Sequence, residues 1–219
     1  MVKHWPFTAS QSVLLLAPPF LLATTYFLFR SSAQQLGPAR AYRIGFLFYW
    51  IIWCFGLSFL TVGFRGIGQM FSPPDPLFGR PNWLGFILLL GPPLITLLTK
   101  FPSEIRSATP TFLAVSTLYA LANGTMEEML WRGSYVVTFP GSWLWGVIYP
   151  SIWFGLWHLS PQVVEAGGVT RGTLAFALMS ITLGLAWGFV AKTSGSIQLT
   201  VATHILLNLA APVGAWFIS

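Results

Sequence analysis

The chain has 219 residues, of which 55% are hydrophobic, 16% are aromatic and only 7% carry a charge. Soluble domains need about 25% charged residues to cover their surface, so this composition excludes a soluble enzyme and a disordered protein. The lone Cys54 excludes a disulfide-stapled secreted domain. The net charge of +6 comes from single Lys and Arg residues between apolar runs, as in loops beside membrane helices. We therefore predict one transmembrane domain over residues 1–219, with the lipid bilayer as a partner and no nucleic acid.

Uncharged apolar runs of the length that a membrane helix needs recur along the chain. A spanning helix takes about 20 mostly apolar residues and satisfies its own backbone hydrogen bonds in lipid. The seven runs are Ser12–Phe29, Ile44–Phe64, Trp83–Thr99, Ser107–Met126, Gly133–Trp157, Gly172–Ala191 and Thr193–Ser219. The alternating pattern of a membrane β-barrel is not visible in the sequence. We expect an all-α, polytopic transmembrane helical bundle of about seven spans, a multi-pass protein of the cell membrane. The compact length favours a prokaryotic plasma membrane.

Proline and glycine residues predict kinks, loops and close helix contacts. Because proline breaks helix hydrogen bonding, two pairs predict a kink or break in their runs: Pro18-Pro19 and Pro92-Pro93. Loops are predicted at Phe64–Asn82 and Gln162–Arg171. We expect the first run to be retained and not cleaved as a signal peptide, because it is long and ends at Arg30. The spacing of Gly184 and Gly188 predicts close packing of the sixth run on a neighbouring helix.

Charge interrupts the apolar pattern at the end of the fourth run. Three of the five acidic residues are expected in solvated loops: Asp75, Glu104 and Glu165. The other two, Glu127 and Glu128, are adjacent and follow a run of 20 uncharged residues. A charge in a spanning helix is costly, so it is usually paired, faces a cavity and serves a function. Glu128 and Arg132 have the i, i+4 spacing of an ion pair, whereas Glu127 is rotated by about 100° and needs another partner.

Two of the three histidines lie in or beside predicted spans. His158 ends the segment Phe154–His158, and His204 begins a segment in which Asn208 follows one turn later on the same face. Each group has a structural explanation by itself: a clamp, a hydrogen-bonded core histidine, or an asparagine that joins helices. Their coincidence in so apolar a chain favours a functional site. We expect the three helices that carry them to face one another around a shared cavity.

A carboxylate and two imidazoles can activate water, either directly as a general base or through a bound metal. Glu127, His158 and His204 are ligand types suited to zinc, which keeps a water position open when three protein ligands bind it. Asn208 would donate a hydrogen bond to a developing oxyanion. The sequence therefore predicts hydrolysis of an acyl bond, with a peptide as the expected substrate, by a zinc-dependent or a metal-free mechanism.

Other intramembrane hydrolases need residues that this chain lacks. Asp75 is the only aspartate, so an aspartyl dyad is excluded. Neither His158 nor His204 is followed by a glutamate, as a His-Glu-x-x-His zinc site requires. Ser194 has Lys192 two residues before it, where a rhomboid-like serine site has glycine.

Three motifs stand in order on successive predicted helices: Glu127-Glu128-x-x-x-Arg132, Phe154-x-x-x-His158 and His204-x-x-x-Asn208. In this order they resemble the CPBP (CAAX protease and bacteriocin-processing) intramembrane endopeptidases, over roughly residues 109–211. The family includes the Ras-converting type of CAAX prenyl endopeptidase. The resemblance implies a peptide or protein substrate at the membrane, with prenylated C-termini and bacteriocin leaders both possible.

The resemblance also implies a role for each motif residue. Glu127 would activate water with His158 as its partner, and Glu128 and Arg132 would support the geometry of their helix. His204 and Asn208 would stabilise the tetrahedral intermediate or bind metal. Zinc-dependent and metal-free versions of the site both stay open, because Glu127, His158 and His204 serve either.

A non-hydrolytic membrane protein is the alternative. A proton-coupled transporter would use the glutamates and histidines as a relay, but its usual pair of repeated halves is not found in the motifs. A bacteriocin immunity factor would bind a peptide with the same residues and not cleave it. We favour the peptidase.

Overall fold

The computed structural model describes residues 6–106, 108–166 and 170–212, and within these ranges every regular element is a helix. The α-helices are α1 (Ala9–Leu36), α2 (Pro38–Phe48), α3 (Ser58–Met70), α4 (Asn82–Thr99), α5 (Phe101–Arg106), α6 (Pro110–Glu128), α7 (Tyr135–Thr138), α8 (Tyr149–Trp157), α9 (Leu159–Ala166), α10 (Arg171–Ser194) and α11 (Gln198–Ala210). Three π-helical segments join some of them: η1 (Tyr49–Leu57), η2 (Met129–Ser134) and η3 (Leu144–Ile148). The prediction of an all-α protein is confirmed.

Capping residues explain where several of these helices start and stop. Gly37 ends α1 with a φ of 83°, and Pro38 occupies the first turn of α2, where its missing N–H costs nothing. Thr109 caps α6 by accepting a hydrogen bond from a backbone N–H, and Pro110 follows it. Thr170 caps α10 in the same way. The α1–α2 hairpin and the starting points of α6 and α10 are therefore set by local sequence.

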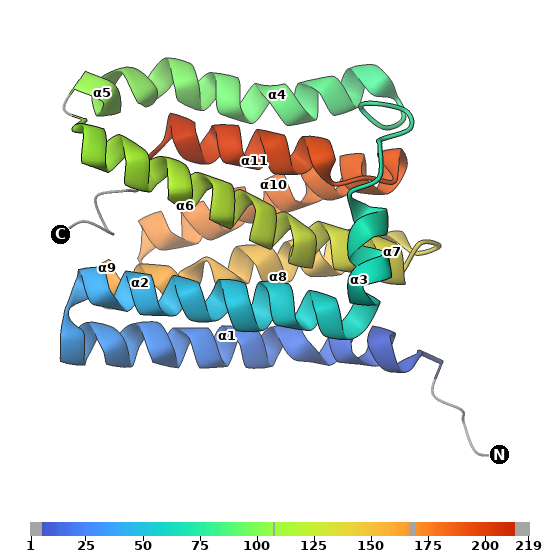
Figure 1. Ribbon diagram of the computed structural model, residues 1–219, viewed down its shortest axis with the longest axis horizontal. Helices are drawn as coiled ribbons and strands as arrows, with labels where there is room; N and C mark the ends of the chain where they lie inside the picture. Colours follow the sequence, from blue (N-terminus) through green and yellow to red (C-terminus); the bar gives the residue numbers. More distant parts are fainter. Residues whose placement is uncertain (1–5, 107, 167–169, 213–219) are drawn as a thin grey trace.

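The long helices lie side by side in one bundle, with α1 and α4 at opposite edges (Figure 1). α2 packs along α1, and α11 contacts both α4 and α6. α10 packs on α8. The helices with the polar motifs, α6, α8 and α11, therefore lie between the two edges of the bundle.

In the part of the chain that the structure describes, four helices are long and apolar enough to cross a membrane: Ala9–Leu36, Pro38–Met70, Asn82–Thr99 and Arg171–Ser194. The expected count of about seven spans is not confirmed. The fifth apolar run is divided, because the chain leaves the helix between α7 and η3, around Pro140 and Gly141. α11 has 13 residues, fewer than a spanning helix needs. α6 has 19 residues, but its last two turns carry Asn123, Glu127 and Glu128.

The predicted helix breaks and loops need correction. α1 and α4 both continue through their proline pairs, so neither helix is broken there. The predicted loop at Phe64–Asn82 starts later than expected, because α3 extends to Met70. Gly63, with a φ of 65°, interrupts the helical backbone within α3. Helices α5 and α9 contain Glu104 and Glu165, so these acids do not lie in loops.

Glycines let the helices that carry the motifs approach closely. A Cβ on Gly124 of α6 would come within 2.8 Å of the Cγ1 of Ile205 on α11, so no larger residue fits without movement. A Cβ on Gly184 would come within 2.9 Å of the Cβ of Ser151, and one on Gly188 would be equally close to a side chain of η3. The predicted packing role of Gly184 and Gly188 is confirmed. The Gly124 contact places the end of α6 directly beside the histidine of α11.

Candidate active site

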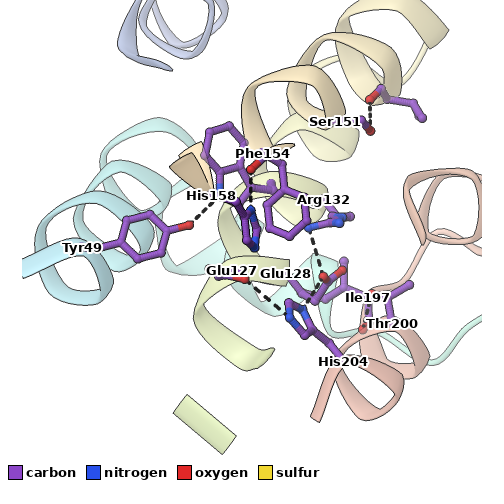
Figure 2. Close-up of polar contacts among 12 residues, drawn as sticks. Tyr49, Glu127, Glu128, Arg132, Ser151, Phe154, His158, Ile197, Thr200 and His204 are labelled. Carbon is purple, nitrogen blue, oxygen red and sulfur yellow. Dashed lines mark hydrogen bonds and ion pairs between the residues drawn. The ribbon is translucent and has the colours of Figure 1, made fainter. Parts of the chain in front are cut away.

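Glu128, Arg132 and His204 form a buried cluster at the end of α6 (Figure 2). The Nη1 of Arg132 lies 3.1 Å from the Oε1 of Glu128, as the i, i+4 spacing predicts. The Nδ1 of His204 lies 2.9 Å from the same oxygen. Because an ionised carboxylate only accepts hydrogen bonds, this Nδ1 donates. One oxygen of Glu128 is therefore held from both α11 and η2.

Glu127 is turned away from Arg132 and faces the other ring nitrogen of His204. Its Oε2 lies 3.5 Å from the Nε2 of His204. The side chain is fully buried, and neither oxygen has a hydrogen bond of ordinary geometry within the described residues. His204 thus lies between the two carboxylates, one at each nitrogen. The partner that the sequence requires for Glu127 is in contact distance on α11.

His158 lies at the C-terminal end of α8, and its ring is directed toward Glu127 (Figure 2). Its Nδ1 is 2.7 Å from the carbonyl oxygen of Phe154, one turn earlier. A carbonyl can only accept, so Nδ1 carries the hydrogen, and the neutral ring has its lone pair on Nε2. The spacing Phe154-x-x-x-His158 therefore fixes the tautomer and the orientation of the ring.

Two aromatic rings surround the buried guanidinium of Arg132. Its Cζ lies 4.0 Å from the ring centroid of Phe154 and 5.5 Å from that of Trp187 on α10. Cation–π attraction is strongest where the cation is desolvated, as it is here. Phe154 thus serves both motif residues beside it, His158 through its carbonyl and Arg132 through its ring.

A cavity of about 580 Å³ meets four of the six predicted site residues: Glu127, His158, His204 and Asn208. Most of its wall is apolar, with Phe46, Trp157, Phe176 and Leu183 among the lining residues. The Nδ2 of Asn208 is buried and has no hydrogen-bond partner among the described residues. Glu128 and Arg132 do not line the cavity. The arrangement can place an apolar peptide segment next to the carboxylate of Glu127, the two imidazoles and the amide of Asn208.

The expected zinc ligands do not form a metal-binding group. Within the described ranges, no set of three or more His, Cys, Asp or Glu side chains is arranged to hold a metal ion. The Nδ1 of His158 donates to a backbone carbonyl and the Nδ1 of His204 donates to Glu128, which leaves the Nε2 lone pair of each neutral ring uncommitted. Because no such set is found among the described residues, the designation as a metalloprotease is not supported.

Two further residues of the site, Trp187 and Asn123, lie outside the sequence motifs. Trp187 contacts Arg132 and lines the cavity, and Asn123 lines the cavity one turn before Glu127. The i, i+4 spacing places Asn123 on the same face of α6 as Glu127, and a polar residue on that face of an apolar helix indicates a place in the site. Trp187 gave no signal, because it is one of 11 tryptophans in an apolar chain.

Comparison with known families matches the part of the chain that holds all three motifs. Residues 109–210 match the family model described as type II CAAX prenyl endopeptidase Rce1-like. No curated protein and no solved structure shows a significant match to the chain. The matched range begins at the cap of α6 and ends with α11.

Proposed function

Because this chain belongs, through residues 109–210, to the CPBP family of intramembrane endopeptidases, we propose that it hydrolyses a peptide bond with water activated by Glu127. The substrate is a peptide or protein at the membrane, and a lipid-modified segment suits the apolar wall of the cavity. The protein is a multi-pass protein of a prokaryotic plasma membrane. The reaction uses the carboxylate of Glu127 directly, without a metal.

The surroundings of Glu127 support this assignment more than any other observation. Its carboxylate is fully buried, lines the cavity and has no hydrogen bond of ordinary geometry among the described residues. A buried polar group without a partner is costly, so such an atom usually has a ligand or reactant to bind. Glu128 has the same chemistry but is already paired.

The remaining cavity residues have separate roles in the proposed reaction. The attacking water lies between Glu127 and the Nε2 lone pair of His158, which accepts one of its hydrogens. Glu127 takes the other proton as the water oxygen bonds to the peptide carbonyl carbon, and the carbonyl electron pair moves to its oxygen. Asn208 donates a hydrogen bond to this oxyanion. On collapse the C–N bond breaks, and Glu127 returns the proton to the leaving amine.

His204 and the charged pair beside it hold this arrangement together. His204 contacts Glu127 at Nε2 and Glu128 at Nδ1, so it fixes the distance between α11 and the catalytic carboxylate. Arg132 compensates the charge of Glu128 away from the cavity. Without this support, two adjacent buried carboxylates would repel each other.

The direct test is Glu127→Gln, which keeps the shape of the side chain and removes the base. The assay uses purified protein in proteoliposomes with two quenched fluorescent peptides of one sequence, a farnesylated CAAX peptide and its unmodified form. We expect cleavage by the wild type and a fall in kcat of about 10³-fold in the variant, as for loss of a general base. Mass spectrometry of the products identifies the broken bond.

The matched control is Glu104→Gln, the same change at an exposed position of α5. This variant should cleave at the wild-type rate. Full cleavage by Glu127→Gln at equal expression would contradict the proposal, and so would a wild type that cleaves neither peptide.

A further inference from the structure

Tyr49 reaches the site from η1, outside the range that the family model matches. Its side chain is fully buried, and its ring stacks on Trp157 with 3.8 Å between centroids. The indole Nε1 of Trp131 lies 2.7 Å from the hydroxyl oxygen of Tyr49. An indole N–H can only donate, so the tyrosine oxygen accepts this bond. The hydroxyl hydrogen of Tyr49 must then find another acceptor.

Asn123 is held by a second tryptophan in the same way. The Nε1 of Trp50, also from η1, lies 3.0 Å from the Oδ1 of Asn123. Because the indole N–H of Trp50 donates, the amide oxygen of Asn123 faces Trp50, and the NH₂ group of Asn123 points away from it. Asn123 stands four residues before Glu127 on α6, and both residues line the cavity. The two side chains therefore share one face of the helix.

The donors of Tyr49 and Asn123 that are not used by the tryptophans lie close to the carboxylate of Glu127. Neither makes a hydrogen bond of ordinary geometry with it in this structure. Figure 2 shows the hydroxyl of Tyr49 directed toward the region of Glu127 and His158. Trp131 stands four residues after Glu127, in the π-helical segment η2, which packs against η1. π-helical turns change which side chains face a neighbour, and they occur often at functional sites.

We propose that Tyr49 and Asn123 are positioning residues that fix the carboxylate of Glu127, with Trp131 and Trp50 setting the direction of their hydrogen bonds. The inference rests on the proposed role of Glu127 as the base. A glutamate side chain has several rotamers, and a base works only when an oxygen points at the water. The hydroxyl of Tyr49 from η1 and the amide of Asn123 from α6 together select one rotamer, so a residue of the N-terminal half of the chain completes a site whose motifs all lie in the other half.

The test is Tyr49→Phe, which removes one hydroxyl and keeps the ring stacked on Trp157. We expect kcat for the peptide substrate to fall about 10- to 100-fold, as for loss of one hydrogen bond to a charged group, with KM changed less than about twofold. The matched control is Tyr135→Phe. Tyr135 is equally buried, but its hydroxyl donates to the carbonyl of Leu14 at 2.7 Å. The control should keep the wild-type kcat.

A double-mutant cycle separates positioning from general destabilisation. Trp131→Phe should lower kcat less than Tyr49→Phe, and the double variant should be no slower than Tyr49→Phe alone, because Trp131 acts through the hydroxyl. Equal kcat in Tyr49→Phe and Tyr135→Phe would overturn the inference and leave the role of Glu127 intact.

An infrared measurement tests the inference even if no peptide is cleaved. The difference spectrum between the wild type and Glu127→Gln isolates the carboxyl band of Glu127. Tyr49→Phe should shift this band, and Tyr135→Phe should leave it in place. An unshifted band in Tyr49→Phe would overturn the inference, whereas loss of the proposed function would show only in the cleavage assay.

Discussion

Glu127 and Glu128 follow one another in the chain, but their surroundings differ. Glu128 is paired with both Arg132 and His204, whereas Glu127 has a single and longer ion-pair contact, with His204. The Oε1 of Glu128 lies within 3.1 Å of Arg132 and 2.9 Å of His204, away from the cavity. Glu127 lines the cavity, and its contact with His204 measures 3.5 Å. Adjacent residues of one helix point in directions about 100° apart, so a single turn places them in two different environments.

The contrast shows how one helix end can supply both structure and chemistry. A carboxylate whose charge is compensated stabilises the packing of α6, η2 and α11, and it has little capacity left for a reaction. A carboxylate that is not part of such a charge pair can accept a proton from water. His204 joins the two regions, because each of its nitrogens faces one of them. The structural pair thereby fixes the position of the reactive group.

Removal of Arg132 should have the largest effect on stability. Arg132→Met deletes the cation that compensates Glu128 and that lies against the ring of Phe154. Breaking one partner of a buried ion pair costs about 3 kcal/mol or more, because the other charge stays buried alone. We expect a corresponding loss in the free energy of unfolding in detergent micelles.

The matched control for this change is Arg106→Met at an exposed position of α5. The double variant Arg132→Met/Glu128→Gln should regain part of the lost stability, since it leaves no uncompensated charge. If Arg132→Met unfolds like Arg106→Met, Glu128 does not depend on this pair, and the contrast between the two glutamates is lost.

Treatment with a metal chelator should have the smallest effect, which is measured on peptide cleavage. Within the described residues, no set of three or more His, Cys, Asp or Glu side chains is arranged to hold a metal ion, and the proposed reaction uses the carboxylate of Glu127 directly. Peptide cleavage by the wild type should therefore be the same before and after treatment with a strong chelator. A loss of cleavage that added Zn²⁺ restores would show that the cavity side of the site binds metal, and it would remove the direct role proposed for Glu127.

Much of the site was predictable because charges are rare in this chain. Five acids and three histidines in 219 residues leave few combinations, and the i, i+4 spacings state which side chains share a helix face. The ion pair of Glu128 with Arg132 follows from the spacing alone. The contacts of His204 with both glutamates do not follow from any spacing in the sequence. They depend on how closely Gly124 lets α11 approach α6.

Other features lay beyond sequence patterns for physical reasons. Apolar content finds lipid-compatible stretches, but it does not reveal the break near Pro140 or the short length of α11, so the count of about seven spans is not confirmed. Tyr49 and Trp131 are aromatic residues among many. Their role depends on a hydrogen bond between residues 82 positions apart, and no local pattern encodes such a bond.

The most direct measurement compares Glu127→Gln and Glu128→Gln in parallel, with peptide cleavage and thermal unfolding recorded on the same preparations. We predict that Glu127→Gln lowers cleavage about 10³-fold and keeps the unfolding midpoint of the wild type. Glu128→Gln should lower the midpoint, because it leaves Arg132 buried without its counter-charge. The opposite pattern, in which Glu127→Gln cleaves normally and Glu128→Gln is stable but inactive, would contradict the assignment of the reactive carboxylate.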